Sequence, residues 1–191
     1  DTAGAILTLL LRPHDRSRAP VDAGVDWLLG LQNNDGGWPT FCRGWGTLPF
    51  DRSATDISAH VLRALAAWQA RDTGRTPHRT RRVRGAIQRG QSFLQHQQRP
   101  DGCWLPLWFG NQYHADEQNP VYGTAKVLRM AHELRLHERP MVAKAVDWLV
   151  AAQLADGGWG PAPVAPASQE QREIAENPAS VEESALATEA L

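Results

Sequence analysis

Apolar side chains recur every three or four residues in a series of segments along the chain, which is the spacing of amphipathic helices. The clearest of these segments is residues 51–68. Its apolar face comprises Ile57, Val61, Leu62, Leu65 and Trp68. No strand-like alternation and no hairpin signal competes with the helical pattern. The pattern therefore predicts an all-α fold.

The segment at residues 51–68 also carries two ionisable residues on its apolar face. Asp56 and His60 are four residues apart, so on a helix they share a face. They lie near the amino end, where unpaired backbone N–H groups favour an anion. The pair predicts a carboxylate and an imidazole on the wall of a buried site or cleft. The structural alternative is a capping arrangement that begins at Ser53, with His60 as a hydrogen-bonded core histidine.

Three segments repeat one pattern, in which a short helix with an aromatic-Leu pair is followed by Gln and then by Asp-Gly-x-Trp. The Gln and Trp residues are Gln32 and Trp38, Gln98 and Trp104, and Gln153 and Trp159. In such a turn, Gly adopts the positive φ that ends a helix, Asp accepts local backbone hydrogen bonds, and Trp covers the helix end. The Gln amide is expected to satisfy backbone groups at a neighbouring helix terminus.

A second set of helices interleaves with these segments. Each begins at a hydroxyl residue followed by Ala, and these residues are Thr2, Ser58, Thr124 and Ser184. The resulting period of near sixty residues predicts an array of helix pairs, each burying its face against its neighbours. Inner and outer helices would alternate and close into a barrel or a curved layer. Both ends of the chain resemble interrupted helices, so residues 1–191 are expected to be part of one domain in a longer protein.

Composition narrows the function classes. The net charge of -1 gives no general attraction to nucleic acid or anionic lipid, and no apolar run is long enough to span a membrane. Cys42 and Cys103 form no metal-spaced cluster, so reduced thiols in a cytosolic setting are expected. The arginine-rich stretch 71–89 is interpreted as a solvated linker running into a helix, with a membrane surface or an acidic partner as the alternative. Residues 160–178 are interpreted as a surface loop.

The three Gln-to-Trp segments resemble the QW repeats of the squalene-hopene and oxidosqualene cyclase family. That repeat reads basic-small-x-x-aromatic-aliphatic, then three residues, Gln, and Gly-x-Trp a few residues later. Residues 89–104 and 144–159 match it in full, whereas the first segment has Ala23 where the family favours a basic residue. The resemblance covers essentially the whole chain and implies an α/α barrel. By itself it indicates the fold of the superfamily and not its activity.

A second resemblance concerns catalysis. Class II terpene cyclases carry Asp-x-Asp-Asp-Thr-Ala at the start of an inner helix, and this chain begins Asp1-Thr-Ala, as though within that motif. The proton donor of the family would lie one residue before Asp1. Asp56-Ile-Ser-Ala-His60 resembles the family's Asp-x-Thr-Ala-His helix, whose His hydrogen-bonds the donor. The resemblance thus implies catalytic roles for Asp1, Asp56 and His60.

Aromatic residues complete the implied site. Asp101-Gly-Cys-Trp104, Trp108 and Tyr122-Gly-Thr resemble the family's Gly-Ser-Trp, Gly-x-Trp and Tyr-Gly-Thr sequence, which implies that Trp108 lines the substrate cavity and that Tyr122 lies near it. Phe41 is a further candidate, because aromatic faces stabilise carbocations. All three have packing or helix-start roles as the alternative. A short loop at residues 38–50 and an apparent insertion at 113–121 leave the substrate and product open.

The implied activity is acid-initiated polycyclisation of a linear isoprenoid such as squalene, with no metal, no redox cofactor and no nucleic-acid partner. The full-length protein is expected to attach to the cytoplasmic side of a membrane through parts outside this chain, whereas residues 1–191 alone are expected to be soluble and inactive. The oligomeric state is open. Two alternatives are a non-catalytic lipid-binding or scaffold relative and a protein prenyltransferase β-like subunit. The second would need a zinc ligand set, which the isolated Cys42, Cys103 and His60 do not suggest.

Overall fold

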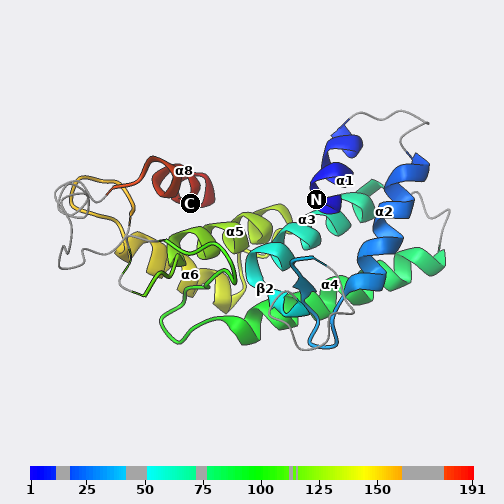
Figure 1. Ribbon diagram of the computed structural model, residues 1–191, viewed down its shortest axis with the longest axis horizontal. Helices are drawn as coiled ribbons and strands as arrows, with labels where there is room; N and C mark the ends of the chain where they lie inside the picture. The colour runs from blue at the N-terminus through cyan, green and yellow to red at the C-terminus, as the bar shows by residue number, and fades with distance from the viewer. Residues whose placement is uncertain (12–17, 42–50, 72–76, 112–113, 115, 161–178) are drawn as a thin grey trace. The chain divides into compact units, whose positions relative to one another are not determined.

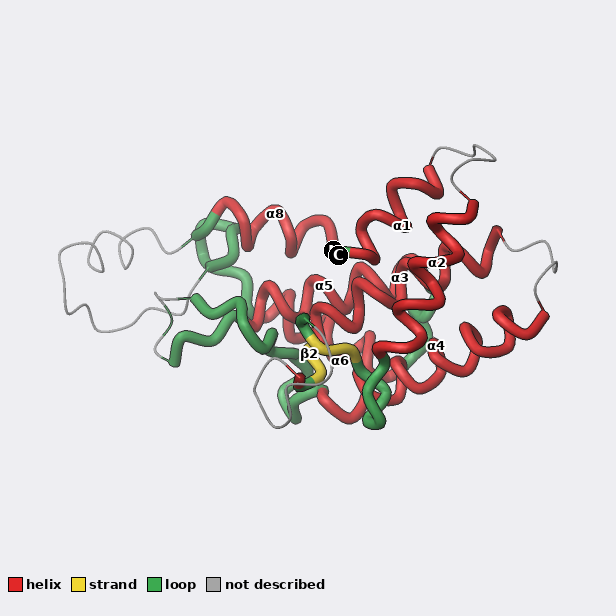
Figure 2. Tube along the Cα trace, turned by 45° about the vertical axis from the view of Figure 1, so that its right-hand side comes forward, coloured by secondary structure: helices red, strands yellow, loops and turns green. Residues whose placement is uncertain are grey.

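The computed structural model describes residues 1–11, 18–41, 51–71, 77–111, 114, 116–160 and 179–191. Most of these residues are helical (Figures 1 and 2). The helices are α1 (Thr2–Leu11), α2 (Arg18–Leu31), α3 (Thr55–Arg71), α4 (Pro77–Gln97), α5 (Pro120–Glu133), α6 (Pro140–Ala151) and α8 (Val181–Ala190). The prediction of an all-α fold is confirmed. The chain divides into two compact units, residues 1–97 and 98–191.

Helix α3 is the centre of the first unit, where it packs against α1 and α4 (Figure 1). It is buried along most of its length, and most of its buried residues are apolar or small. Its fully buried residues include Ala59, Leu62, Ala64 and Leu65. Helix α2 packs against α1 and α4 and buries Val21, Val25 and Leu28, the spacing of a single helical face. The predicted alternation of two helix types therefore appears in this unit.

A two-residue antiparallel strand pair joins the end of α2 to the start of α3. Strand β1 (Trp38–Pro39) pairs with β2 (Ser53–Ala54), with Trp38 opposite Ala54 and Pro39 opposite Ser53. These strands were not predicted, because two residues are too few to show the alternation of apolar and polar side chains that indicates a strand. The pairing holds Trp38, which is fully buried, directly beside the first turn of α3.

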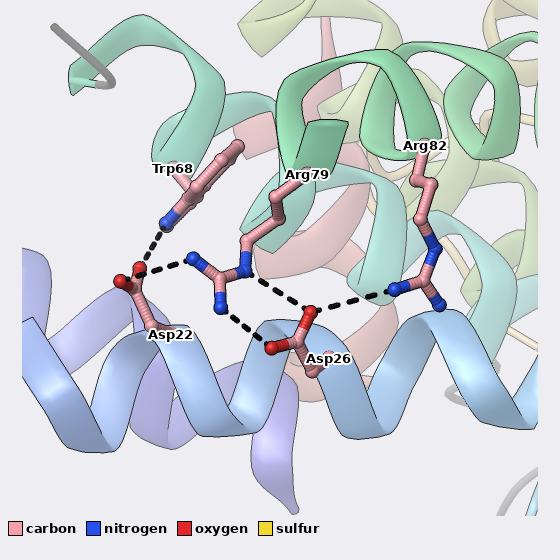
Figure 3. Close-up of polar contacts among 5 residues, drawn as sticks. All are labelled: Asp22, Asp26, Trp68, Arg79 and Arg82. Atoms are coloured by element: carbon pink, nitrogen blue, oxygen red, sulfur yellow. Dashed lines mark hydrogen bonds and ion pairs between the residues drawn. The ribbon is translucent and has the colours of Figure 1, made fainter. Parts of the chain in front are cut away.

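The arginine-rich stretch was expected to be a linker that runs into a helix, and the helix is present: α4 begins at Pro77 and takes up most of the stretch, while residues 72–76 lie outside the described residues. Pro is well suited to a first helical position. Arg79 of α4 donates to Asp26 Oδ2 at 2.7 Å and to Asp22 Oδ2 at 3.2 Å, and the Trp68 indole donates to Asp22 Oδ1 at 2.9 Å (Figure 3). The guanidinium of Arg79 lowers the pKa of Asp26. The acidic partners of Arg79 thus lie within the chain, on α2.

Helix α5 is the centre of the second unit and packs against α6 and α8 (Figure 2). It begins with Pro120 after Asn119, whose side chain accepts a hydrogen bond from the Tyr122 backbone N–H. Helix α8 begins after Ser180, whose hydroxyl accepts a hydrogen bond from the Glu183 backbone N–H. Both starts are local N-caps specified by side chains of the expected type. The loop predicted after Gly160 lies outside the described residues.

The three Asp-Gly-x-Trp turns share one hydrogen-bonding pattern. Gly36, Gly102 and Gly157 have φ of 94°, 107° and 88°, which confirms the predicted positive φ. In each turn the Asp carboxylate accepts from the backbone N–H two residues later, and the Gln amide donates to the Gly carbonyl. Each Trp backbone N–H donates to the hydroxyl of the following inner helix, and these hydroxyls belong to Ser58, Thr124 and Ser184.

The first two turns are also closed by the next outer helix. Gln32 donates to Ala86 O at 3.0 Å, and Gln98 donates to Met141 O at 2.8 Å. Met141 lies in the first turn of α6, as predicted for a helix terminus, whereas Ala86 lies in the middle of α4, so Gln32 reaches the neighbouring helix away from its ends. Arg89 Nη2 in turn donates to Gln32 Oε1 at 2.5 Å. The basic residue of one segment therefore contacts the Gln of the preceding segment.

Candidate active site

The amino end of α3 carries the predicted carboxylate and imidazole. Asp56 lies in the first turn and is buried, with 6% of its surface exposed. His60 follows one turn later, and 35% of its side chain is exposed. Ser53 lies in strand β2, two residues before the helix begins at Thr55, and its hydroxyl donates to Asp35 Oδ1 at 2.7 Å and accepts from Asn33 Nδ2 at 3.0 Å. Helix α3 thus presents an accessible imidazole one turn from a buried carboxylate.

The packing of α1 on α3 brings His60 to Asp1. His60 Nε2 lies 3.8 Å from Asp1 Oδ1, a separation at which the two groups attract electrostatically when the imidazole is protonated. The side chain of Asp1 is 93% exposed. The structure therefore places Asp1, which follows the donor position of the family motif, close to His60, with Asp56 on the same helix as His60.

Gly4 permits this approach and was missed in the sequence. A Cβ at Gly4 would lie 3.0 Å from Asp1 Oδ1 and 3.5 Å from His60 Nε2. A larger residue would crowd both groups. The available signal was a glycine inside an otherwise strongly apolar helical segment, which commonly marks a close approach.

The aromatic candidates of the second unit form a surface cluster. Trp108 and Phe109 are 47% and 54% exposed, and the Phe109 ring stacks on the Tyr122 ring with centroids 5.0 Å apart. Lys126, one turn further along α5, places its Nζ 4.9 Å from the Tyr122 centroid. Trp108 and Tyr122 therefore belong to one region, as predicted. Phe109 was missed, although its position beside Trp108 was a usable signal.

Phe41 belongs to the first unit, follows β1 and is 64% exposed. Residues 42–50, which follow it, lie outside the described residues. Its role as a substrate contact stays a prediction.

Two further ionisable groups in the second unit are buried. Burial raises the pKa of the Glu183 carboxyl, which is 5% exposed and accepts a hydrogen bond from Asn111 Nδ2 at 3.1 Å. Burial, together with the nearby Asp101 carboxylate, raises the pKa of the Cys103 thiol to about 12. Among the described residues, no three His, Cys, Asp or Glu side chains gather as metal ligands. None of the described helices has the length and apolarity needed to cross a bilayer.

Similarity to known proteins extends over the whole chain. Residues 1–191 match the family model of the squalene-hopene cyclase C-terminal domain. Enfumafungin synthase from Hormonema carpetanum is 32% identical over 84% of this chain and 13% of its own. A squalene-hopene cyclase from Bradyrhizobium diazoefficiens is 29% identical over 84% of this chain and 24% of its own. Drimenyl diphosphate synthase from Streptomyces showdoensis is 31% identical over 87% of this chain and 27% of its own. The chain thus spans between 13% and 27% of the length of these relatives.

Proposed function

Because the chain belongs to the squalene-hopene cyclase family, we propose that the full-length protein is a class II terpene cyclase. Its reaction would be the acid-initiated polycyclisation of a linear isoprenoid, with squalene as the first candidate substrate. A chain ending in a diphosphate is the second candidate, because drimenyl diphosphate synthase is among the relatives. The observation that carries the proposal is the approach of His60 Nε2 to Asp1 Oδ1 beside a buried Asp56.

The chemistry explains why these groups are needed. Protonation of an isolated alkene requires a neutral carboxylic acid in a water-poor site. The family motif puts that acid immediately before Asp1. His60 would hydrogen-bond the acid, orient its proton toward the alkene and, as an imidazolium, stabilise the carboxylate that remains after transfer. Asp56 would favour the protonated imidazole from one turn away. Loss of a proton from the final carbocation completes the balance.

The aromatic cluster of the second unit supplies the other requirement. Carbocations must be stabilised without a nucleophile that would trap them, and the negative faces of aromatic rings do this. Trp108 and Phe109 offer such faces because about half of each side chain is exposed. Tyr122 supports Phe109 by stacking. Phe41 remains a candidate for the same role from the first unit.

The test is a squalene cyclisation assay on the full-length protein and its His60→Ala variant. Loss of a positioned acid–base group lowers the rate by roughly 10²–10⁴-fold. We expect that reduction in product formation, with a circular dichroism spectrum like that of the wild type. The matched control is His132→Ala, which removes a histidine from the last turn of α5 and should retain activity. Full activity in His60→Ala would refute the proposed role.

Further measurements on the same protein separate the alternative functions. Tight squalene binding without product would indicate a lipid-binding relative of the same fold. Stoichiometric zinc in the purified protein would favour a prenyltransferase-like subunit. The substrate dissolves in membranes, so we further propose peripheral attachment of the full-length protein to the cytoplasmic side of a membrane, which sedimentation with liposomes would test. We also propose that residues 1–191 form part of one α/α-barrel domain of the full-length protein.

A further inference from the structure

The start of α8 differs from the starts of α3 and α5. In α3, α5 and α8 a hydroxyl residue accepts the backbone N–H of the preceding Trp. The residue before that hydroxyl is Ile57 in α3 and Gly123 in α5, but it is Glu183 in α8. Glu183 is 5% exposed, so a carboxyl group is buried where the other two repeats place an apolar side chain or none. Burying such a group is unfavourable unless it is paired.

The side chain of Glu183 reaches a segment far away in the sequence. Its Oε1 accepts a hydrogen bond from Asn111 Nδ2 at 3.1 Å. The backbone N–H of Asn111 donates to Glu117 O at 3.0 Å, and Gly110 lies against the same carbonyl. His114 and Glu182 contribute opposite electrostatic effects on Glu183, and Ser180 also hydrogen-bonds it. Glu183 therefore anchors the loop at Asn111 from helix α8.

This loop is the one that carries the exposed aromatic residues. Its other end is fixed by Trp104, which is fully buried and whose backbone N–H donates to Thr124 Oγ1 at 3.1 Å. Between the two anchors, Trp108 and Phe109 are about half exposed. Phe109 stacks on Tyr122 of α5. A loop pinned at both ends presents its rings in a defined orientation at little further entropic cost.

We propose that Glu183 is a positioning residue, which through Asn111 holds the segment carrying Trp108 and Phe109 against Tyr122 and so shapes the aromatic surface that the isoprenoid contacts. The contact with substrate rests on the proposed function, whereas the anchoring of the segment does not. The role requires an acceptor oxygen at Glu183 and not its charge. Burial raises the pKa of this carboxyl, which agrees with a hydrogen-bonding role. Glu183→Gln, which retains the acceptor, should therefore keep the wild-type exchange of residues 105–111 and the wild-type products.

The experiment compares Glu183→Ala, Asn111→Ala, the double variant and Glu183→Gln in the full-length protein. Hydrogen–deuterium exchange of residues 105–111 reports the anchoring, and the ratio of products formed from squalene reports the shape of the surface. Leaving one partner of a buried hydrogen bond unsatisfied corresponds to about a tenfold change. We expect exchange in residues 105–111 to accelerate by that factor in both single variants and no further in the double variant. The product ratio should shift, or KM should rise with kcat retained.

One control variant and a set of contradicting outcomes make the experiment decisive. Glu189→Ala, which removes an exposed carboxylate from the same helix, should leave exchange and products unchanged. Unchanged exchange in both Ala variants, additive effects in the double variant, or equal acceleration throughout α5 and α8 would overturn the proposal. A loosened segment with an unchanged product ratio would overturn its effect on the surface. If the wild type converts no isoprenoid but exchange responds as expected, the proposed function fails and the anchoring role stands.

Discussion

The first and third Asp-Gly-x-Trp turns have the same sequence pattern but different surroundings. In both, Gln donates to the Gly carbonyl and the Trp indole donates to a Leu carbonyl ten residues earlier. Gln32 is buried and Gln153 is exposed. A Cβ at Gly36 would lie 2.5 Å from Arg89 O, whereas one at Gly157 would have nothing within 4 Å in the described part of the chain. The turn is therefore built by its own residues, and its burial depends on the next outer helix.

The largest expected effect comes from removing the indole of the buried turn. Trp38→Ala deletes a fully buried side chain together with its bond to Leu28 O, so the free energy of unfolding should fall by about 3–5 kcal/mol. Trp159→Ala, at 5% exposure, should fall near the lower end of that range. Urea denaturation of the full-length protein measures both. Equal stability of both variants and the wild type would contradict the structural role of the turns.

The glycines give a matched pair in which only the surroundings differ. Gly36→Ala and Gly157→Ala both place a Cβ at positive φ, which costs about 1–2 kcal/mol. At Gly36 the Cβ would also collide with the backbone at Arg89, adding roughly 1–3 kcal/mol of overpacking. Thermal unfolding should therefore show a larger loss for Gly36→Ala than for Gly157→Ala. Identical losses would mean that the next helix does not press on the first turn.

The glutamines should show the same contrast at smaller size. Gln32→Ala removes the donor to Ala86 O and the acceptor for Arg89, which should cost about 1–3 kcal/mol because buried groups lose their partners. Gln153→Ala removes an exposed side chain and should cost about 0.5 kcal/mol or less. Chemical denaturation measures the difference. A larger effect at Gln153 would reverse the comparison.

The third repeat also differs by the buried carboxyl of Glu183, and pH should reveal it. Because burial raises the pKa of Glu183, its contribution to stability is fully present below the pKa of the unfolded chain and is lost as pH rises through the folded-state pKa. Glu183→Gln should therefore gain in melting temperature relative to the wild type as the pH rises above the unfolded-state pKa of about 4.3. Glu189→Gln, on the exposed side of α8, is the control. A difference that does not change with pH would show that Glu183 does not titrate in this way.

Sequence predicted those parts of the fold that short segments determine by themselves. The helices and the turns at Gly36, Gly102 and Gly157 follow from local spacing and from a residue that tolerates positive φ. The ion pairs of Arg79 were missed because α2 and α4 meet only in the folded chain, and a linker and a helix with the same charges look alike in sequence. The strand pair at Trp38 was missed because each strand has only two residues, too few to show alternation.

The candidate site divides in the same way. Asp56 and His60 are predictable because four residues set their separation on one helix. The family motif implied a contact between His60 and the residue before Asp1, whereas the approach of Asp1 itself to His60 follows from the packing of α1 on α3. Gly4 and Phe109 had only weak signals in the sequence, and their importance follows from a neighbour on another segment. The roles assigned to Asp1, Asp56, His60, Phe41, Trp108 and Tyr122 stay predictions for the assays above.

Cys103 lies within the second turn, and the rate at which its thiol is labelled can report how often that turn opens. Its side chain is 2% exposed and its pKa is raised to about 12, so in the closed turn it is both shielded and protonated at neutral pH. Disulfide reagents react with the exposed thiolate, and therefore only with molecules in which this turn has opened. In a Cys42→Ser background, the labelling rate would report how often the second turn opens while the rest of the protein stays folded.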